Sequence, residues 1–92
     1  MAILDFSPDA FSAYQGLADT PTRGVLLDRI DEVLDLLEKN PGQQRLRRHR
    51  LNPPGVWAVL VHAHDETWAI LWAQRPEDPD AVMIEYLGPY RL

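Results

Sequence analysis

The chain contains no cysteine among its 92 residues, which excludes disulfide bonds and thiolate metal sites. No apolar run approaches the ~20 residues of a membrane-spanning helix, so we expect a soluble protein without a membrane segment. The first nine residues lack the basic segment and the long apolar core of a secretory signal. We therefore expect a cytoplasmic location, and a chain of this length predicts a single domain over residues 1–92.

Positive charge is scarce outside one short segment. The formal net charge is −5, but residues 1–38 carry −6, residues 39–50 carry +5 and residues 51–92 carry −4. A nucleic-acid footprint would therefore be centred on the middle segment. The alternative to nucleic-acid binding is an edge strand whose charges keep it soluble and prevent it from pairing with another chain. The candidate RNA-binding residues of this basic segment are Arg45, Arg47, Arg48 and Arg50.

Residues 56–74 organise the rest of the chain, because they form two apolar runs that include all three tryptophans. The pattern predicts a central β-hairpin. We expect its turn to be centred on Asp65–Glu66, which pairs Val61 with Ile70. A sheet with one apolar face packs helices there and leaves its milder face, here with His62 and His64, to water or a ligand. Side-chain alternation gathers the large residues on the apolar face, which comprises Trp57, Val59, Val61, Ala63, Trp68, Ile70 and Trp72.

Two helices are predicted between a first short strand and the remaining strands. Ser7 followed by Pro8 and Asp9 is typical of a helix start, and we expect a helix to about residue 18 whose buried face contains Phe11, Tyr14 and Ala18. A second cap and proline precede a helix that ends at residue 39. Its acidic face is either solvated or a surface for a basic partner. Its apolar stripe is Leu26, Ile30, Val33, Leu34 and Leu37.

The predicted fold class is α+β, in the order β-α-α-β-β-β-β, with a two-helix hairpin on one face of a mainly antiparallel sheet. We expect an edge strand at residues 46–51 and a last strand at residues 81–87. In the last strand, Val82, Ile84 and Tyr86 should share one face, and Met83, Glu85 and Leu87 the other.

Histidine and tyrosine are the candidate proton-transfer groups. His49 and His62 have the side chain whose ordinary pKa suits proton transfer near neutrality. His62 and His64 could also chelate a metal, but a specific site needs at least three converging ligands, so we expect no metal and no cofactor. Tyr90 is an acid or base, a stacking platform or a hydrophobic plug. Glu85 is either a general base or a solvated partner of an arginine.

The order of elements and several local strings resemble the RelE/ParE superfamily of toxins from bacterial type II toxin–antitoxin systems. The strings span nearly the whole chain, from residues 3–10 at the first helix start to residues 85–89 at the end of the last strand. Between them lie residues 36–41 closing the second helix, the basic residues 45–51, Trp57 opening the third strand and residues 70–72 in the fourth.

This resemblance implies a cytoplasmic toxin with a cognate antitoxin protein and, in one branch, metal-free cleavage of mRNA on the ribosome by the 2′-oxygen of the RNA itself. Another branch poisons DNA gyrase, so the alternative is a non-catalytic protein-binding module; a homodimer is also compatible. Tyr90 and Arg91 lie near the place where the family carries its last functional residues, and Arg75 could supply charge from the neighbouring loop. With the histidines argued from their chemistry, the candidate catalytic residues are His49, His62, Tyr90 and Arg75, and Arg91 joins the basic segment as a candidate RNA-binding residue. The ribonuclease branch carries an arginine on the fourth strand, and the corresponding position in this chain, at about Trp68–Ala69, has no arginine. The chain also has a pI of about 4.9, whereas toxins of this kind are usually basic.

Overall fold

The computed structural model of the chain describes residues 2–41, 46, 49–50, 55–63, 66–75 and 77–90, with the backbone alone at Arg23, His49, Arg50 and Pro79. The α+β fold predicted from the sequence is confirmed, in the expected order. The elements are β1 (Ile3–Phe6), α1 (Pro8–Ala18), the short 3₁₀ helix η1 (Pro21–Arg23), α2 (Gly24–Lys39), β2 (His49–Arg50), β3 (Val56–Ala63), β4 (Glu66–Arg75) and β5 (Asp78–Pro89).

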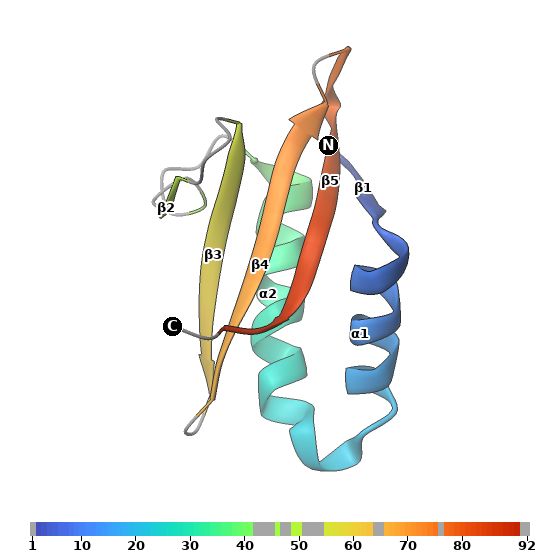
Figure 1. Ribbon diagram of the computed structural model, residues 1–92, viewed down its shortest axis with the longest axis vertical. Coiled ribbons are helices and arrows are strands. Elements are labelled where there is room, and N and C mark those ends of the chain that lie inside the picture. Colours follow the sequence, from blue (N-terminus) through green and yellow to red (C-terminus); the bar gives the residue numbers. More distant parts are fainter. Residues whose placement is uncertain are drawn as a thin grey trace.

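The strands form one sheet in the order β1-β5-β4-β3-β2 (Figure 1). Three neighbouring pairs, from β2 to β5, are antiparallel. The first strand lies beside the last and parallel to it, with Leu4 opposite Val82 and Phe6 opposite Ile84. This parallel pair requires a long crossover, which the two helices supply.

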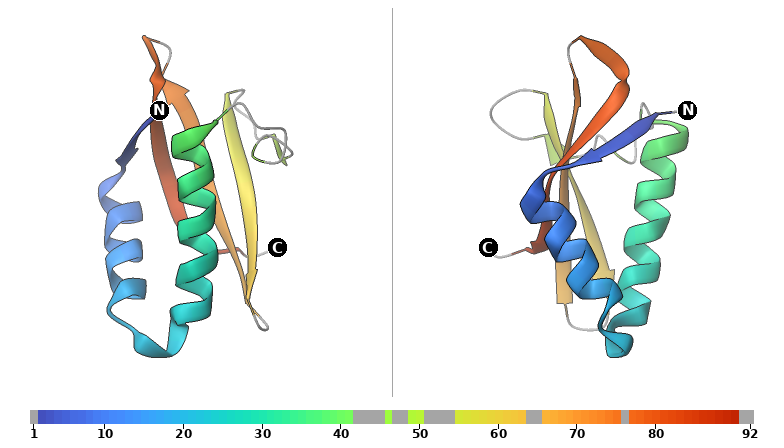
Figure 2. Two further views of the ribbon diagram at one scale, coloured as in Figure 1. Left: turned by 180° about the vertical axis from the view of Figure 1, so that it is seen from behind. Right: turned by 90° about the vertical axis from the view of Figure 1, so that its right-hand side faces the viewer.

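Both helices lie on the same side of the sheet (Figure 2), where α2 packs against β3 and α1 packs against β5. The apolar stripe predicted for α2 is confirmed, because all five of its residues are buried. The helix ends at Lys39, as expected, and the backbone N–H of Asn40 donates to the carbonyl of Leu36 at 2.8 Å. No helix in the described part of the chain covers the other side of the sheet, which we call the open face.

The start of α1 is as predicted, but its buried face is not. The Ser7 hydroxyl accepts a hydrogen bond from the Ala10 backbone N–H at 3.2 Å, and Pro8 occupies the first turn. The buried residues of the helix are Ala10 and Leu17, whereas Ala18 is exposed and Phe11 is 47% exposed. The expected face was wrong at Phe11 and Ala18, whereas Tyr14 is partly buried against the core; the ring of Phe11 lies against that of Phe6, with the centroids 6.2 Å apart.

The central hairpin has the predicted faces but a different register. Ala63 pairs with Glu66 and Val61 with Trp68, so the pairing is shifted by two residues from the one expected for a turn at Asp65–Glu66. A shift of two, unlike a shift of one, leaves every side chain on its original face. The tryptophan-rich face therefore still packs under the helices, with Trp68 and Trp72 buried.

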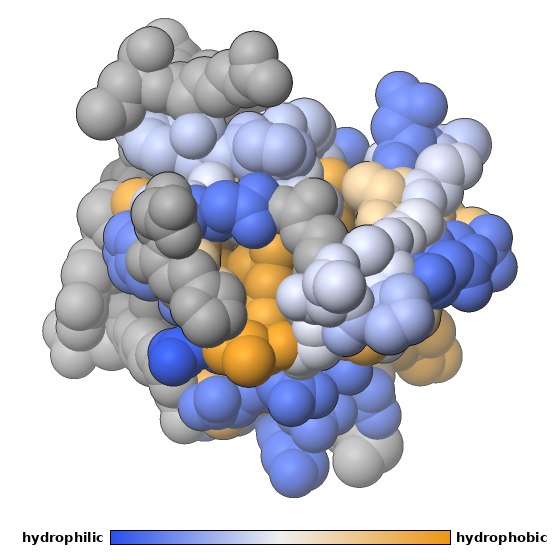
Figure 3. Space-filling model, turned by 90° about the horizontal axis from the view of Figure 1, so that it is seen from below, coloured by the Kyte–Doolittle hydropathy of each residue, from blue (hydrophilic) through white to orange (hydrophobic). Residues whose placement is uncertain are grey.

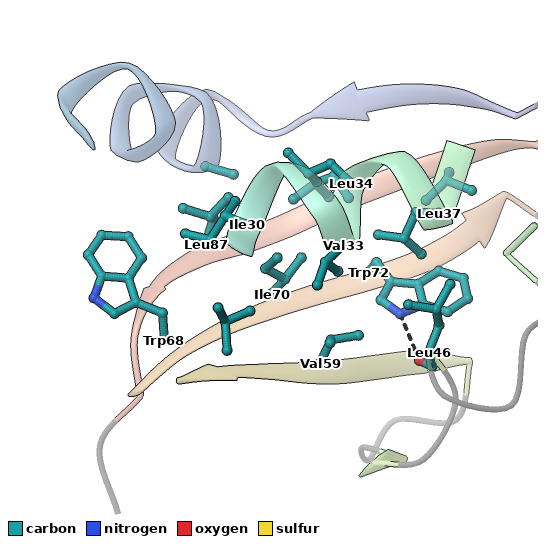
Figure 4. Close-up of a cluster of buried hydrophobic side chains, with 14 of the residues drawn as sticks. Ile30, Val33, Leu34, Leu37, Leu46, Val59, Trp68, Ile70, Trp72 and Leu87 are labelled. Atoms are coloured by element: carbon teal, nitrogen blue, oxygen red, sulfur yellow. Dashed lines mark hydrogen bonds between the residues drawn. The ribbon is translucent and has the colours of Figure 1, made fainter. Parts of the chain in front are cut away.

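Of the basic edge strand expected at residues 46–51, the structure describes His49 and Arg50, which pair with Ala58 and Trp57, while residues 47, 48 and 51 lie outside the described residues. Leu46, which was expected in this strand, is instead a fully buried core residue outside it. Figure 4 shows the Leu46 side chain beside Trp72, whose indole Nε1–H donates a hydrogen bond to the Leu46 carbonyl at 3.0 Å. The basic segment is thus tied to the core at its start.

The last strand begins at Asp78, before the expected residue 81, and contains an irregularity that changes its faces. Trp72 of β4 pairs with Ile84, but the preceding Leu71 pairs with Tyr86, so Glu85 is an extra residue in the strand. A β-bulge of this kind interrupts the alternation of side chains. The expected grouping was therefore wrong at both residues beyond the bulge: Leu87 is buried under the helices, and Tyr86 is 41% exposed.

Seen from the end at which β3 meets β4 and α1 meets α2, apolar side chains reach the surface in the middle of a polar rim (Figure 3). No helix in the described part of the chain combines the length and the apolar content that crossing a membrane requires.

Candidate functional site

The open face is the milder of the two sheet faces, as the sequence predicted. Along each strand, the residues of the open face alternate with the buried residues of the core, and apolar side chains of small and medium size form the centre of the open face. Ala58 and Ala69 are almost inaccessible there, with 6% and 2% of their surface exposed. The face comprises Ala58, Leu60 and His62 from β3, Thr67, Ala69, Leu71 and Ala73 from β4, and Met83, Tyr86 and Gly88 from β5.

The bulge in β5 is fixed in place by the residue that also caps α1. The Ser7 backbone N–H donates to the carbonyl of Ile84 at 2.9 Å, and its hydroxyl donates to the carbonyl of Glu85 at 3.0 Å. Because the bulge adds one residue, both Glu85 and Tyr86 are exposed. The Tyr86 ring lies over Gly88, so closely that a Cβ at residue 88 would be 2.8 Å from the phenol oxygen. The Tyr86 hydroxyl donates a hydrogen bond to the carbonyl of Pro89 at 2.9 Å.

His62 and Tyr90 lie at the same end of the sheet. The Nδ1 of His62 is 3.0 Å from the Thr67 hydroxyl, directly across the β3–β4 pair. The backbone N–H of Tyr90 donates to the carbonyl of the same Thr67 at 2.8 Å. Both side chains are exposed, so two candidate proton-transfer residues flank Thr67 of β4, His62 from β3 and Tyr90 from the end of β5.

A cation that the sequence reasoning missed shares a hollow with His62. This hollow, of about 150 Å³ between β3 and α2, is lined by Arg29, Glu32, Val33, Leu60, Val61 and His62. Arg29 is an isolated basic residue on a largely acidic helix face, and its helical position alone does not indicate which strand it approaches.

Arg75 lies at the other end of the sheet. Thr67 and Arg75 are near opposite ends of β4, about 26 Å apart at the usual rise per residue of an antiparallel strand. The Arg75 guanidinium is 3.3 Å from the Asp5 carboxylate on β1 and 4.0 Å from that of Glu77. The structure therefore does not bring Arg75 together with His62 and Tyr90.

A larger hollow opens on the open face beside Arg75. Its volume is about 400 Å³, and its lining combines apolar residues with Glu85 and Arg75. The Nε atom of Arg75 is buried without a hydrogen-bond acceptor among the described residues. Sequence reasoning named Glu85 and Arg75 separately and missed that the bulge and the strand register place them around one hollow, which is lined by Gly55, Val56, Ala73, Gln74, Arg75, Met83 and Glu85.

The basic segment borders the same end of the sheet as this hollow. The backbone of β2 places His49 beside Ala58 and Arg50 beside Trp57, close to the start of β3, where Val56 lines the hollow. Only the backbone of His49 and Arg50 is described. The remaining predicted RNA-binding residues, Arg45, Arg47, Arg48 and Arg91, lie outside the described residues, as does His64.

The position at which the ribonuclease branch of the resembled family carries an arginine is apolar in this chain. Trp68 faces the helices, and Ala69 faces the open side between Leu60 and Gly88. No group of three or more histidines and carboxylates that could hold a metal ion is present in the part of the chain that is described. At this position, the described part of the open face therefore carries no charged side chain.

No protein-family model matches the chain, and no curated protein matches it in sequence. Solved structures with the same fold include a YoeB–YefM complex from Staphylococcus aureus, with a TM-score of 0.69 and 16% identity, covering 100% of this chain and 99% of that one. A heterotetrameric YoeB–YefM toxin–antitoxin complex from the same organism gives a TM-score of 0.66 at 16% identity, covering 100% and 99%. A YoeB dimer, also from Staphylococcus aureus, gives 0.71 at 18% identity, covering 99% of this chain and 98% of that one. The resemblance to toxins of toxin–antitoxin systems that the sequence predicted is therefore confirmed at the level of the fold.

Proposed function

We propose, from the premise that the chain has the fold of the YoeB toxins, that it is a RelE-like toxin whose open face binds and cleaves RNA without a metal. The proposal covers a ribonuclease of full or attenuated activity, and it includes a cognate antitoxin that neutralises the toxin. It would act in the cytoplasm on mRNA at the ribosome. The observation that carries it is the sheet face that the helices leave uncovered, bordered through β2 by the only strongly basic segment of the chain.

RNA cleavage of this type needs a base, an acid and cations. The 2′-hydroxyl of the RNA loses a proton and its oxygen attacks the adjacent phosphorus, while the 5′-oxygen leaves and takes up a proton. His62 and Tyr90 are the described pair that supports these two proton transfers, because both side chains are exposed and both residues flank Thr67, which contacts the His62 ring and the Tyr90 backbone. In this reaction His62 accepts the proton and Tyr90 donates one. His49 on β2 is the other candidate base.

Cations would hold the RNA phosphates and offset the charge that develops on the phosphoryl oxygens. The four arginines of the basic segment and Arg91 are the proposed phosphate ligands. Arg29 adds a cation that shares a hollow with His62. Arg75 is proposed to contact RNA from the other end of the face, although it is too far along β4 to act on the same phosphate as His62.

The test is the purified chain, free of antitoxin, in a cell-free translation extract, with cleaved mRNA ends mapped by primer extension. We expect cleavage at discrete positions by the wild-type chain, growth arrest on its expression in cells, and loss of both in the variants R48A and R50A. Absence of cleavage and of growth arrest with the wild-type chain would contradict the proposal.

Two further partners belong to this proposal. YoeB has been solved with YefM and as a dimer, so we propose a cognate antitoxin for this chain and a homodimer in its absence. A short reading frame next to the gene that encodes a DNA-binding protein is the expected source of the antitoxin. Co-expression should restore growth and yield a stable complex, and light scattering of the toxin alone should give the mass of two chains.

A second candidate function is a non-catalytic binding module on the same scaffold, such as a gyrase inhibitor. It is favoured by the apolar Ala69 at the centre of the open face and by the distance between Arg75 and the His62 end. It predicts that the chain arrests growth or retains a single protein partner, gyrase in the named case, without cleaving RNA.

A further inference from the structure

We propose that the hollow beside Arg75 is a nucleobase subsite and that its chemistry selects guanine. This inference deepens the proposed function and rests on it in one respect, namely that RNA is the ligand of the open face. We call the hollow the base subsite and define it by Val56, Ala73, Arg75, Met83 and Glu85.

The size and floor of the base subsite suit a flat, partly apolar ligand. Its volume of about 400 Å³ lies within the range of small-molecule clefts. The floor is formed by Val56, Ala73 and Met83, which come from three neighbouring strands and have partly exposed side chains. The apolar side chains of this part of the sheet offer van der Waals contact to one face of a base.

The two charged groups of the subsite have opposite hydrogen-bonding character. An ionised Glu85 offers acceptors only, whereas Arg75 offers donors only. The Arg75 guanidinium is 3.3 Å from Asp5 and 4.0 Å from Glu77, and the side chain is still 40% exposed, so its five N–H donors outnumber these two contacts. A ligand that satisfies both groups must present donors on one edge and acceptors on another.

Guanine has this arrangement. Its N1–H and N2–H₂ donors lie side by side and fit the two oxygens of one carboxylate, and its O6 and N7 are the acceptors that arginine recognises most often. Adenine presents one amine beside acceptors, and uracil presents a single N–H. Neither can occupy both oxygens of Glu85 while it contacts Arg75.

The fold sets the backbone position of Glu85 and gives Arg75 a contact with another strand. Glu85 is the extra residue of the β5 bulge, and Ser7 holds that bulge through its backbone N–H and its hydroxyl. Arg75 is anchored to β1 through Asp5. β2 lies at the same end of the sheet, with the backbone of His49 opposite Ala58 and that of Arg50 opposite Trp57.

The chain carries a direct probe of this subsite, because Met83 is its only methionine besides Met1. Protein labelled with ¹³C at the methionine methyl groups should be titrated with GMP, AMP, UMP and ribose 5-phosphate, with the Met1 resonance as the reference. We expect the Met83 resonance to shift with GMP, at an affinity at least about tenfold higher than for AMP or UMP, which is the discrimination that one good bidentate contact provides. Ribose 5-phosphate should not shift it.

Two variants distinguish recognition by Glu85 from a general effect of charge. E85Q should weaken GMP binding by about tenfold or more, because the amide replaces an acceptor with a donor. E77Q removes an equal charge beside Arg75 but does not line the subsite, so it should retain the preference for GMP. Equal shifts with all nucleotides, an equal shift with ribose 5-phosphate, or no shift of Met83 would each overturn the proposal.

The outcome is separable from that of the proposed function. Cleavage of RNA with no preference for guanine at any fixed position would leave the toxin proposal intact and contradict the base subsite. If the chain binds GMP at Met83 but cleaves no RNA, the base subsite is supported and the ribonuclease proposal is contradicted.

Discussion

Trp72 donates its indole N–H to the backbone carbonyl of Leu46 at 3.0 Å, and both residues are fully buried. Leu46 stands in the middle of a polar and basic run, so this hydrogen bond and the burial of the leucine side chain fix the start of the basic segment against β4. The tryptophan therefore has two roles: it fills the core, and it positions the segment proposed to bind RNA.

The substitution Trp72→Phe should lower the free energy of unfolding by about 3 kcal/mol. It leaves the buried Leu46 carbonyl without the indole donor, and it also removes volume from the core. Urea unfolding followed by circular dichroism measures it, and a single transition is expected for one domain. Trypsin should also cut faster after the arginines of residues 45–50.

The matched control is Ile70→Val, which trims the same core without removing a hydrogen bond and should cost about 1 kcal/mol. It should leave the rate of tryptic cleavage in the basic segment unchanged under conditions where both proteins are folded. Equal cleavage rates in the two variants would show that Trp72 does not position the segment.

The two helices are linked by a hydrogen bond from the Tyr14 hydroxyl on α1 to the Asp31 carboxylate on α2, at 2.6 Å. This bond, with burial and the charges of Asp31 and Asp35, raises the pKa of Tyr14 from 10.0 to about 12. The bond thus favours the protonated tyrosine. Its contribution to stability is fully present below pH 10 and is lost as the pH rises towards 12.

Tyr14→Phe should therefore reduce the free energy of unfolding by about 1 kcal/mol near neutral pH, because the bond is only partly buried. The difference between wild type and variant should shrink between pH 10 and pH 12. Chemical unfolding at a series of pH values measures it, and a difference that stays constant over this range would mean that the hydroxyl contributes through packing alone.

His62→Gln should lower the rate of RNA cleavage by about 100-fold or more if His62 transfers a proton, since the amide cannot act as a general base. Thr67→Val, which removes the hydroxyl that contacts Nδ1, should give a smaller loss. Single-turnover cleavage of an RNA substrate measures both. The control is His49→Gln on β2: if the large loss follows this change and not His62→Gln, proton transfer takes place at the other end of the sheet.

The sequence predicted those parts of the fold in which a periodic pattern meets a single buried face. The stripe of α2 and the two faces of the hairpin follow from such patterns. The hairpin register did not, because it depends on a turn whose residues favour no particular type. The prediction of which β5 residues share a face failed beyond the bulge, because Ser7, from a distant part of the chain, stabilises that bulge.

The candidate site was predicted residue by residue but not as a geometry. The open face and the position of His62 on it follow from side-chain alternation. The distance from Thr67 to Arg75 could have been read from the length of one strand. The pairing of Arg75 with Asp5, the approach of Arg29 to His62, and the shared hollow of Arg75 and Glu85 depend on contacts between elements far apart in the sequence.

The central claim is that the open face is the surface that acts on RNA. The most direct measurement places the same new charge on each side of the molecule: Leu71→Glu at the centre of the open face, and Val25→Glu on α2, where Val25 is 47% exposed. Cleavage of mRNA in a translation extract should be lost in the first variant and retained in the second, with both proteins folded. Cleavage by Leu71→Glu at the wild-type rate would contradict the account.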